Sequence, residues 1–189
     1  MRFLETGLDG LWLIEPEYVR DSRGAFGRVF CEQEFSARRL ETRFVQHSQS
    51  VSWKRGTRRG LHFQLPPHDE IKIVSCIAGC IWDVVVDIRR DSSSYGAWYA
   101  VELSPSTGRQ LYIPRGFAHG FQSLTDDAVT QYLISDFYAP ASARGVAHDD
   151  PDIKIAWPEA PAIMSQKDQG WPTLSELLQT GVPIEQAAS

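Results

Sequence analysis

Short apolar runs separated by turn residues dominate the middle of the chain. The runs are rich in Val, Ile, Tyr, Phe and Trp, and clusters of Gly, Pro, Asp and Ser punctuate them. The segment IKIVSCIAGCIWDVVVDI, residues 71–88, predicts two strands joined by a tight turn at Ala78-Gly79. Further strands are predicted at residues 97–104, 110–114, 117–124 and 128–138. Strands at this spacing, without helical periods between them, are typical of a β-sandwich or barrel and not of a βαβ fold.

Helical signals are sparse. The segment CEQEFSARRLE predicts a short amphipathic helix near residues 32–41. In TLSELLQTG, Thr173 precedes Glu176 by three positions, which is the capping-box arrangement of a helix N-terminus, and the predicted helix ends at Gly181. We therefore predict an all-β barrel with short peripheral helices.

Length and composition predict one globular domain over residues 1–189. We expect its core barrel at about residues 44–138, with N-terminal strands and a C-terminal helix as decorations. Hydrophobic residues make up 42% of the chain and charged residues 23%, which excludes disordered and fibrous classes. The net charge of −5 argues against nucleic acid or a membrane surface as a partner. An anionic ligand would need a local cluster of arginines.

The sequence predicts a cytoplasmic protein. It contains no apolar run near the ~20 residues that span a bilayer, and its start, MRFLETGLDG, lacks the order of a signal peptide. Cys31, Cys76 and Cys80 are an odd number of cysteines, and reduced thiols are the simplest interpretation.

The stretch RRGLHFQLPP, residues 58–67, places His62 in an apolar run behind two arginines and a glycine. This histidine can be a core residue, a metal ligand or a base that faces a pocket. Metal cupins resemble one another in an H-x-H pair, a following Glu and a later His. Here Gln64 replaces the second histidine, and His119 alone occupies the later place. Because amide oxygens are poor ligands for transition metals, we predict no metal site.

Several polar residues interrupt the apolar strands: Arg59, His62, Lys72, Asp83, His119, Tyr132 and Asp168. Taken singly, each fits a structural role, such as a hydrogen-bonded core histidine or a paired aspartate. A base, a cation and a phenol in one barrel favour proton chemistry, because buried charges are paired or used. Strand alternation puts Gly60 and His62 on one face and Arg59 on the other, so Arg59 reaches the same pocket only at a strand mouth or through a bulge at Gly60.

A set of motifs from about residue 3 to residue 178 resembles the dTDP-4-dehydrorhamnose 3,5-epimerase family. They include RDSRGAFGRVF, VQHSQS, RRGLHFQLPPH, LYIPRGFAHGFQSL, QYLISDFYAP, DDPDIKIAWP and MSQKDQGWP. The resemblance implies a double-stranded β-helix of the jelly-roll, cupin-like type, with no cofactor. It also implies a homodimer that acts on a dTDP-4-keto-6-deoxy sugar by inverting C3 and C5.

The resemblance assigns the chemistry to four residues. His62 resembles the base that removes the proton beside the ketone, and Asp168 its carboxylate partner. Lys72 resembles the residue that holds the C4 oxygen as it becomes an enolate, and Tyr132 the acid on the opposite face. For a reaction of this kind, a histidine suits the base role and a cation stabilises the enolate.

The same resemblance implies a set of substrate contacts. Arg23, Gln46 and Arg59 are expected to bind the diphosphate and sugar, with Arg23 contributed by the partner subunit. Phe26 and Tyr138 are expected at the thymine, and His119 in the sugar pocket.

Three positions depart from the family pattern: Arg28 where Glu is frequent, Ser48 where Asn is frequent, and Glu70 where Gln is common. All three can touch the nucleotide or the sugar. The alternatives are an epimerase that inverts only C3 or only C5 of a related sugar, a metal-dependent cupin enzyme, and a sugar-nucleotide binding module without activity.

Overall fold

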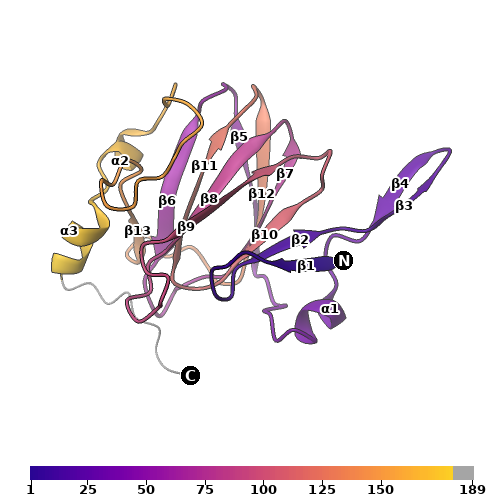
Figure 1. Cartoon of the computed structure of the whole chain (residues 1–189), viewed down its shortest axis with the longest axis horizontal. Coiled ribbons are helices and arrows are strands. Elements are labelled where there is room, and N and C mark those ends of the chain that lie inside the picture. The colour runs from indigo at the N-terminus through magenta and orange to yellow at the C-terminus, as the bar shows by residue number, and fades with distance from the viewer. Residues whose placement is uncertain (181–189) are drawn as a thin grey trace.

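The computed structural model describes residues 1–180, which form two packed β-sheets with short helices at their margins (Figure 1). Among these residues, the first sheet has six strands in the order β1 (Arg2–Glu5), β2 (Trp12–Glu15), β10 (Gln110–Ile113), β7 (Lys72–Ala78), β12 (Ala128–Ile134) and β5 (Gln46–Ser52). The second has five described strands, β13 (Ala143–Gly145), β6 (Arg58–Gln64), β11 (Phe117–Ser123), β8 (Ile81–Asp87) and β9 (Trp98–Leu103).

Neighbouring strands in both sheets are antiparallel. From β6 to β13 the chain passes repeatedly between the two sheets, as in a jelly roll. The predicted all-β fold with short peripheral helices is therefore confirmed. The sheets extend beyond the predicted core of residues 44–138, because β1 and β2 continue the first sheet and β13 pairs with β6.

The turn at Ala78-Gly79 joins strands of different sheets. β7 pairs with β10 and β12, whereas β8 pairs with β11 and β9. The two predicted strands and the turn between them are confirmed, and the turn connects one sheet to the other. Alternation of apolar residues specifies a strand, while the choice of neighbour depends on distant segments.

The core explains why β8 is almost continuously apolar. Val85 faces the space between the two sheets and packs with Val74. Val84 and Val86 face the opposite side, where α3 (Leu174–Gln179) covers them with Leu177. A strand that is buried on both faces loses the apolar–polar alternation of a half-exposed strand.

Three helices are formed by the described residues, and α1 (Glu32–Ser36) is shorter than the helix predicted over residues 32–41. Arg39 has a φ of 58°, and Leu40 N–H returns to Phe35 O at 3.0 Å. This reversal lets Leu40 pack in the cluster that contains the fully buried Phe35. Tertiary packing therefore ends the helix before its amphipathic pattern does.

The C-terminal helix α3 begins with the predicted capping box between Thr173 and Glu176. Thr180 is its C-cap, and the predicted stop residue Gly181 lies outside the described residues. The remaining helix, α2 (Gln166–Gln169), had no prediction. Within residues 1–180, no helix combines the length and apolar character needed to cross a membrane.

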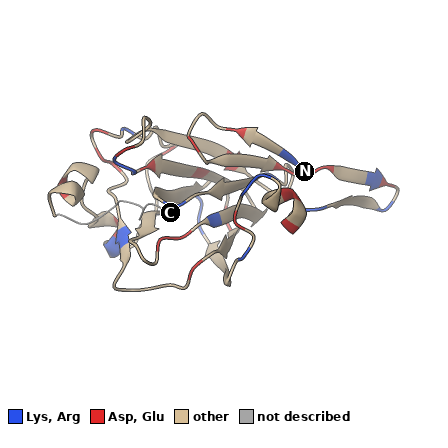
Figure 2. Cartoon of the chain, turned by 90° about the horizontal axis from the view of Figure 1, so that it is seen from below, with Lys and Arg blue, Asp and Glu red and all other residues tan. Residues whose placement is uncertain are grey.

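The strands β3 (Tyr18–Asp21) and β4 (Gly24–Gly27) form a hairpin separate from both sheets. It stands away from the body of the molecule in both views (Figures 1 and 2). Figure 2 also shows acidic and basic residues interspersed along the described chain.

A β-bulge interrupts β6 at Gly60. His119 of β11 pairs with His62, and Phe121 pairs with Arg59, so two steps on β11 correspond to three on β6. Gly60 is the extra residue of the bulge. Its φ is 115°, and a Cβ at this position would lie 2.6 Å from Gly120 Cα. The close approach of β6 to β11 therefore requires a glycine at this position.

We predict that Gly60→Ala lowers the free energy of unfolding by more than about 3 kcal/mol, because it adds a backbone clash to a left-handed φ. Urea denaturation measures this. Gly7→Ala is the matched control, since Gly7 has a φ of 88° with no atom within 4 Å of the added Cβ. The control should lose only about 1–2 kcal/mol. Equal losses in the two variants would contradict the steric explanation.

Candidate active site

A cavity of about 650 Å³ opens between the two sheets. Its walls come from β5, β6, β7, β11 and β12, and from the segment at residues 163–171. Nine of the predicted site residues line it: Gln46, Ser48, Arg59, His62, Lys72, His119, Tyr132, Tyr138 and Asp168. Residues from separate parts of the sequence are thus brought to one place.

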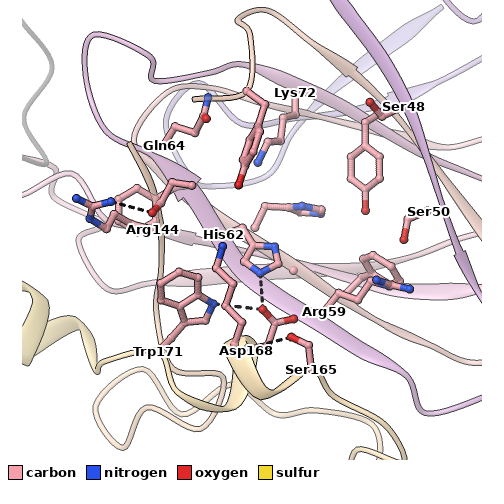
Figure 3. Close-up of a pocket in the computed structure, with 18 of the residues that line it drawn as sticks. Ser48, Ser50, Arg59, His62, Gln64, Lys72, Arg144, Ser165, Asp168 and Trp171 are labelled. Atoms are coloured by element: carbon pink, nitrogen blue, oxygen red, sulfur yellow. Dashed lines mark hydrogen bonds and ion pairs between the residues drawn. The ribbon is translucent and has the colours of Figure 1, made fainter. Parts of the chain in front are cut away.

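His62 and Asp168 form a hydrogen-bonded pair. His62 Nε2 lies 2.6 Å from Asp168 Oδ1, and Gly60 N–H donates to Asp168 Oδ2 at 3.3 Å (Figure 3). Asp168 lies on α2, where Ser165 Oγ caps the helix by accepting the Asp168 N–H. Burial acts to raise the pKa of the Asp168 carboxyl. The hydrogen bond and charge of His62, together with the hydrogen bonds from Gly60 and Trp171, outweigh it and leave that pKa below its ordinary value.

The bulge at Gly60 explains how Arg59 reaches the same cavity as His62, although strict alternation along β6 would place the two side chains on opposite faces. With one extra residue between them, Arg59 and His62 both line the cavity. Arg59 Nη2 donates to Val51 O at 3.0 Å, which directs the guanidinium toward β5. The sequence left two routes open for Arg59, a strand mouth or a bulge at Gly60, and the structure contains the bulge.

Lys72 forms an ion pair with Glu70 inside the cavity. Its Nζ lies 2.7 Å from Glu70 Oε1, and each side chain is 11% exposed. Gln64 Nε2 donates to Glu70 Oε2 at 2.5 Å, and Gln64 Oε1 accepts the Ala139 N–H at 2.7 Å. Gln64, the residue in place of a second metal-binding histidine, therefore connects the Lys72 pair to the loop after β12.

His119 forms a second histidine–aspartate pair with Asp83, a residue for which the sequence indicated only a structural role. His119 Nε2 lies 2.8 Å from Asp83 Oδ1, and both side chains are buried. Burial raises the pKa of the Asp83 carboxyl above its ordinary value, although the charge and hydrogen bond of His119 and the charge of Lys72 oppose this rise. The signal in the sequence was an aspartate inside the valine-rich β8, a position that requires a partner.

Tyr132 extends from β12, in the sheet opposite His62. Its ring lies 6.0 Å from the His119 ring, edge to face. Burial and the nearby charge of Asp83 raise the pKa of the Tyr132 phenol, although Arg59 opposes them. The phenol is consequently protonated at neutral pH and can donate a proton.

Arg23, Phe26 and Arg28 lie outside the cavity of their own chain. Arg23 and Phe26 belong to the β3–β4 hairpin, where the Arg23 side chain is 87% exposed and pairs with Asp21. Arg28 Nη1 lies 3.7 Å from Glu34 Oε1. Arg23 is expected at the cavity of a partner subunit, so its position outside its own cavity agrees with that expectation. The substrate contacts of all three residues stay predictions.

Several residues at the cavity wall were not predicted from the sequence, among them Arg144, Ser165, Lys167 and Trp171. Trp171 Nε1 donates to Asp168 Oδ1 at 3.3 Å. An isolated Trp in a Gly- and Pro-rich segment was its only signal. Among residues 1–180, no group of three or more His, Cys, Asp or Glu side chains is close enough to hold a metal ion.

Comparison with known proteins identifies the family. The family model described as dTDP-4-dehydrorhamnose 3,5-epimerase matches residues 5–176. The chain belongs to this family.

Individual relatives agree along nearly the whole chain. The dTDP-4-dehydrorhamnose 3,5-epimerase of Methanothermobacter thermautotrophicus is 45% identical, over 93% of this chain and 95% of its own length. The solved structure of dTDP-6-deoxy-D-glucose-3,5-epimerase from Legionella pneumophila in complex with dTDP-4-keto-L-rhamnose has a TM-score of 0.90 at 37% identity, covering 98% of this chain and 99% of that chain. The dTDP-4-dehydrorhamnose 3-epimerase of Streptomyces niveus is 37% identical, over 96% of this chain and 88% of its own length. The cupin-like jelly-roll fold predicted from the family resemblance is thereby confirmed.

We predict that Asp168→Asn destabilises this family member by about 1–3 kcal/mol at pH 7, because the charged hydrogen bonds are lost. The folded-state pKa of Asp168 lies below its ordinary 3.8. The stabilisation is therefore complete above the unfolded-state pKa and disappears as the pH falls through the folded-state pKa. Urea denaturation from pH 7 to pH 3 measures the difference between variant and wild type.

The matched control for this measurement is Asp91→Asn, at an exposed position. Its stability should follow that of the wild type at every pH. A difference for Asp168→Asn that stays constant down to pH 3 would contradict a stabilising role of the Asp168 charge.

Proposed function

We propose that this chain inverts C3 and C5 of dTDP-4-dehydro-6-deoxy-D-glucose and so produces dTDP-4-dehydro-L-rhamnose. The observation that carries the proposal is the placement of three groups at one cavity. A histidine base lies on one sheet, a protonated phenol lies on the facing sheet, and an ammonium group lines the same cavity. These groups are the ones that inversion beside a ketone needs.

His62 removes the proton from the carbon beside the C4 ketone, and the carboxylate of Asp168 stabilises the imidazolium that forms. The electron pair left on carbon moves into the C4 carbonyl, which becomes an enolate. Lys72, whose side chain is 11% exposed, donates to this oxygen, and such an interaction is worth several kcal/mol in typical enzymes. The enolate then collapses and the carbon takes the proton of the Tyr132 hydroxyl from the opposite face.

The mouth of the cavity suits the nucleotide end of the substrate. Arg59 offers a planar guanidinium that can bind phosphate oxygens bidentately. Tyr138 presents a 60% exposed ring, and its backbone N–H donates to Gln46 Oε1 at 2.7 Å. We assign Arg59 to the diphosphate, Tyr138 and Gln46 to the thymidine end, and His119 and Ser48 to the sugar pocket.

A homodimer is part of the proposal, because the β3–β4 hairpin lacks cover of its own. Two-stranded hairpins are marginally stable alone in water, yet Val19 and Phe26 are 75% and 79% exposed. The strand β5 also lies at a sheet edge, with Val51 44% exposed. A second copy of the chain that receives the hairpin would cover these apolar groups and bring Arg23 and Phe26 to its cavity.

A single-carbon epimerase is the second candidate, favoured by the likeness to the dTDP-4-dehydrorhamnose 3-epimerase of Streptomyces niveus. The same base, phenol and ammonium serve inversion at one carbon or at two. We also propose that the protein is one cytoplasmic domain, which is supported by the three free thiols of Cys31, Cys76 and Cys80.

We predict that incubation with the keto-sugar nucleotide in deuterated water places solvent deuterium at both C3 and C5, as followed by NMR. His62→Ala should abolish the exchange, since the proton is no longer removed. Tyr132→Phe should reduce net inversion at least about tenfold more than initial exchange, because only the opposite-face proton is lost. Deuterium at one carbon would select the single-carbon enzyme, and equal loss of both steps in Tyr132→Phe would contradict its role as acid.

We predict that mixing two defective variants restores activity. His62→Ala removes the base, and Arg23→Ala removes the guanidinium of the hairpin, but a mixed dimer regains one intact site if the hairpin serves the partner. Random exchange of subunits should then recover about a quarter of the wild-type rate, because half of the dimers are mixed and each holds one complete site. No recovery, with exchange of subunits verified by mass spectrometry, would show that Arg23 does not act on the partner.

A further inference from the structure

We propose that Trp171 is a positioning residue for the His62–Asp168 pair. Its indole N–H donates to the Asp168 carboxylate, and its ring packs beside the His62 imidazole and limits the positions that the imidazole can take. The inference rests on the proposed function, because it assigns Trp171 to the proton-abstraction step and not to substrate binding.

Trp171 acts first through the Asp168 carboxylate. Trp171 Nε1 donates to Oδ1 at 3.3 Å, and the same oxygen pairs with His62 Nε2 at 2.6 Å (Figure 3). Gly60 N–H donates to the other oxygen at 3.3 Å. Three N–H groups, two from β6 and one from Trp171, therefore define the orientation of the carboxylate.

The indole also occupies the space next to His62. In the pairing of β13 with β6, Gly145 lies directly opposite His62. A Cβ added at Gly145 would overlap the Trp171 ring, so the indole fills the position of the side chain that Gly145 lacks. The rings of Trp171 and His62 lie 6.2 Å apart at an angle of 74°.

This support is needed because Asp168 does not lie on a barrel strand. It belongs to α2, a helix of four residues, and a single helical turn has little stability of its own. The segment is attached to the barrel by backbone hydrogen bonds at each end, from Arg58 N to Ile163 O at 2.9 Å and from Ala147 N to Pro172 O at 2.8 Å. Between these attachments, Trp171 links Asp168 to the barrel at Gly145.

The test substitutes Phe for Trp171, which keeps an aromatic ring over Gly145 and removes the N–H. The matched control is Trp53→Phe, since Trp53 is 76% exposed and does not line the cavity. We expect kcat and the rate of deuterium entry to fall about five- to tenfold in Trp171→Phe, with KM changed less than about twofold. The control should keep both constants.

A second measurement does not depend on turnover. The downfield proton NMR signal of the His62–Asp168 hydrogen bond, assigned by its absence in His62→Asn, should shift in Trp171→Phe and stay unchanged in Trp53→Phe. Gly145→Ala keeps the N–H but displaces the ring, and it should also shift the signal. If that strand variant does not fold, Trp171→Phe still decides the question.

Two results would overturn the proposal: an unchanged kcat or an unchanged NMR signal. A KM that rises while kcat is constant would show that the indole contacts the substrate. A wild-type protein that incorporates no deuterium would refute the proposed function instead, and the NMR signal would still report whether Trp171 positions the pair.

Discussion

The hydrogen bond between His62 and Asp168 joins the barrel to the segment that follows it, and the proposed chemistry depends on this bond. His62 lies on β6, which is fixed by neighbours on both sides, whereas Asp168 lies on a one-turn helix outside the sheets. The base is therefore complete only when the C-terminal segment is docked. The bulge at Gly60 contributes to the same arrangement, since the Gly60 N–H binds the carboxylate.

Charges inside the cavity are compensated, while those at its mouth are more open. Lys72 is paired with Glu70, and His119 with Asp83. Arg59 and Lys167 line the same cavity and are exposed. This distribution suits a substrate with an uncharged sugar at one end and an anionic diphosphate near the other, and it explains how a chain of net charge −5 can bind an anion.

The sequence predicted those features that local rules decide. Alternation and turn residues located the strands, and the Thr173–Glu176 capping box located α3. For Arg59, strand alternation left two routes to the His62 pocket open, and only the structure shows that the bulge at Gly60 is the one used. Features that depend on distant segments were not predictable in this way. The end of α1 at Ser36 follows from packing around Phe35, and the sheet change between β7 and β8 follows from their separate neighbours.

The residues of the candidate site likewise separate into those that local motifs identify and those that only the folded structure brings together. The motifs named His62, Lys72, Tyr132 and Asp168, but pattern alone could not reveal that Asp83 pairs with His119 across 36 positions, or that Trp171 binds Asp168. For the hairpin residues Arg23 and Phe26, the motif did indicate a role, but the structure of one chain does not contain the contact. A motif can name a substrate contact, yet which chain's cavity receives it depends on assembly.

The central claim is that base and acid act on opposite faces of one sugar ring. The most direct test is a crystal structure with a dTDP-6-deoxy sugar that carries a hydroxyl in place of the C4 ketone and so cannot react. The account predicts the His62 imidazole against one face of the ring, the Tyr132 hydroxyl against the other, and Lys72 Nζ beside the oxygen on C4. A sugar bound with both side chains on the same face, or outside the cavity between the sheets, would contradict it.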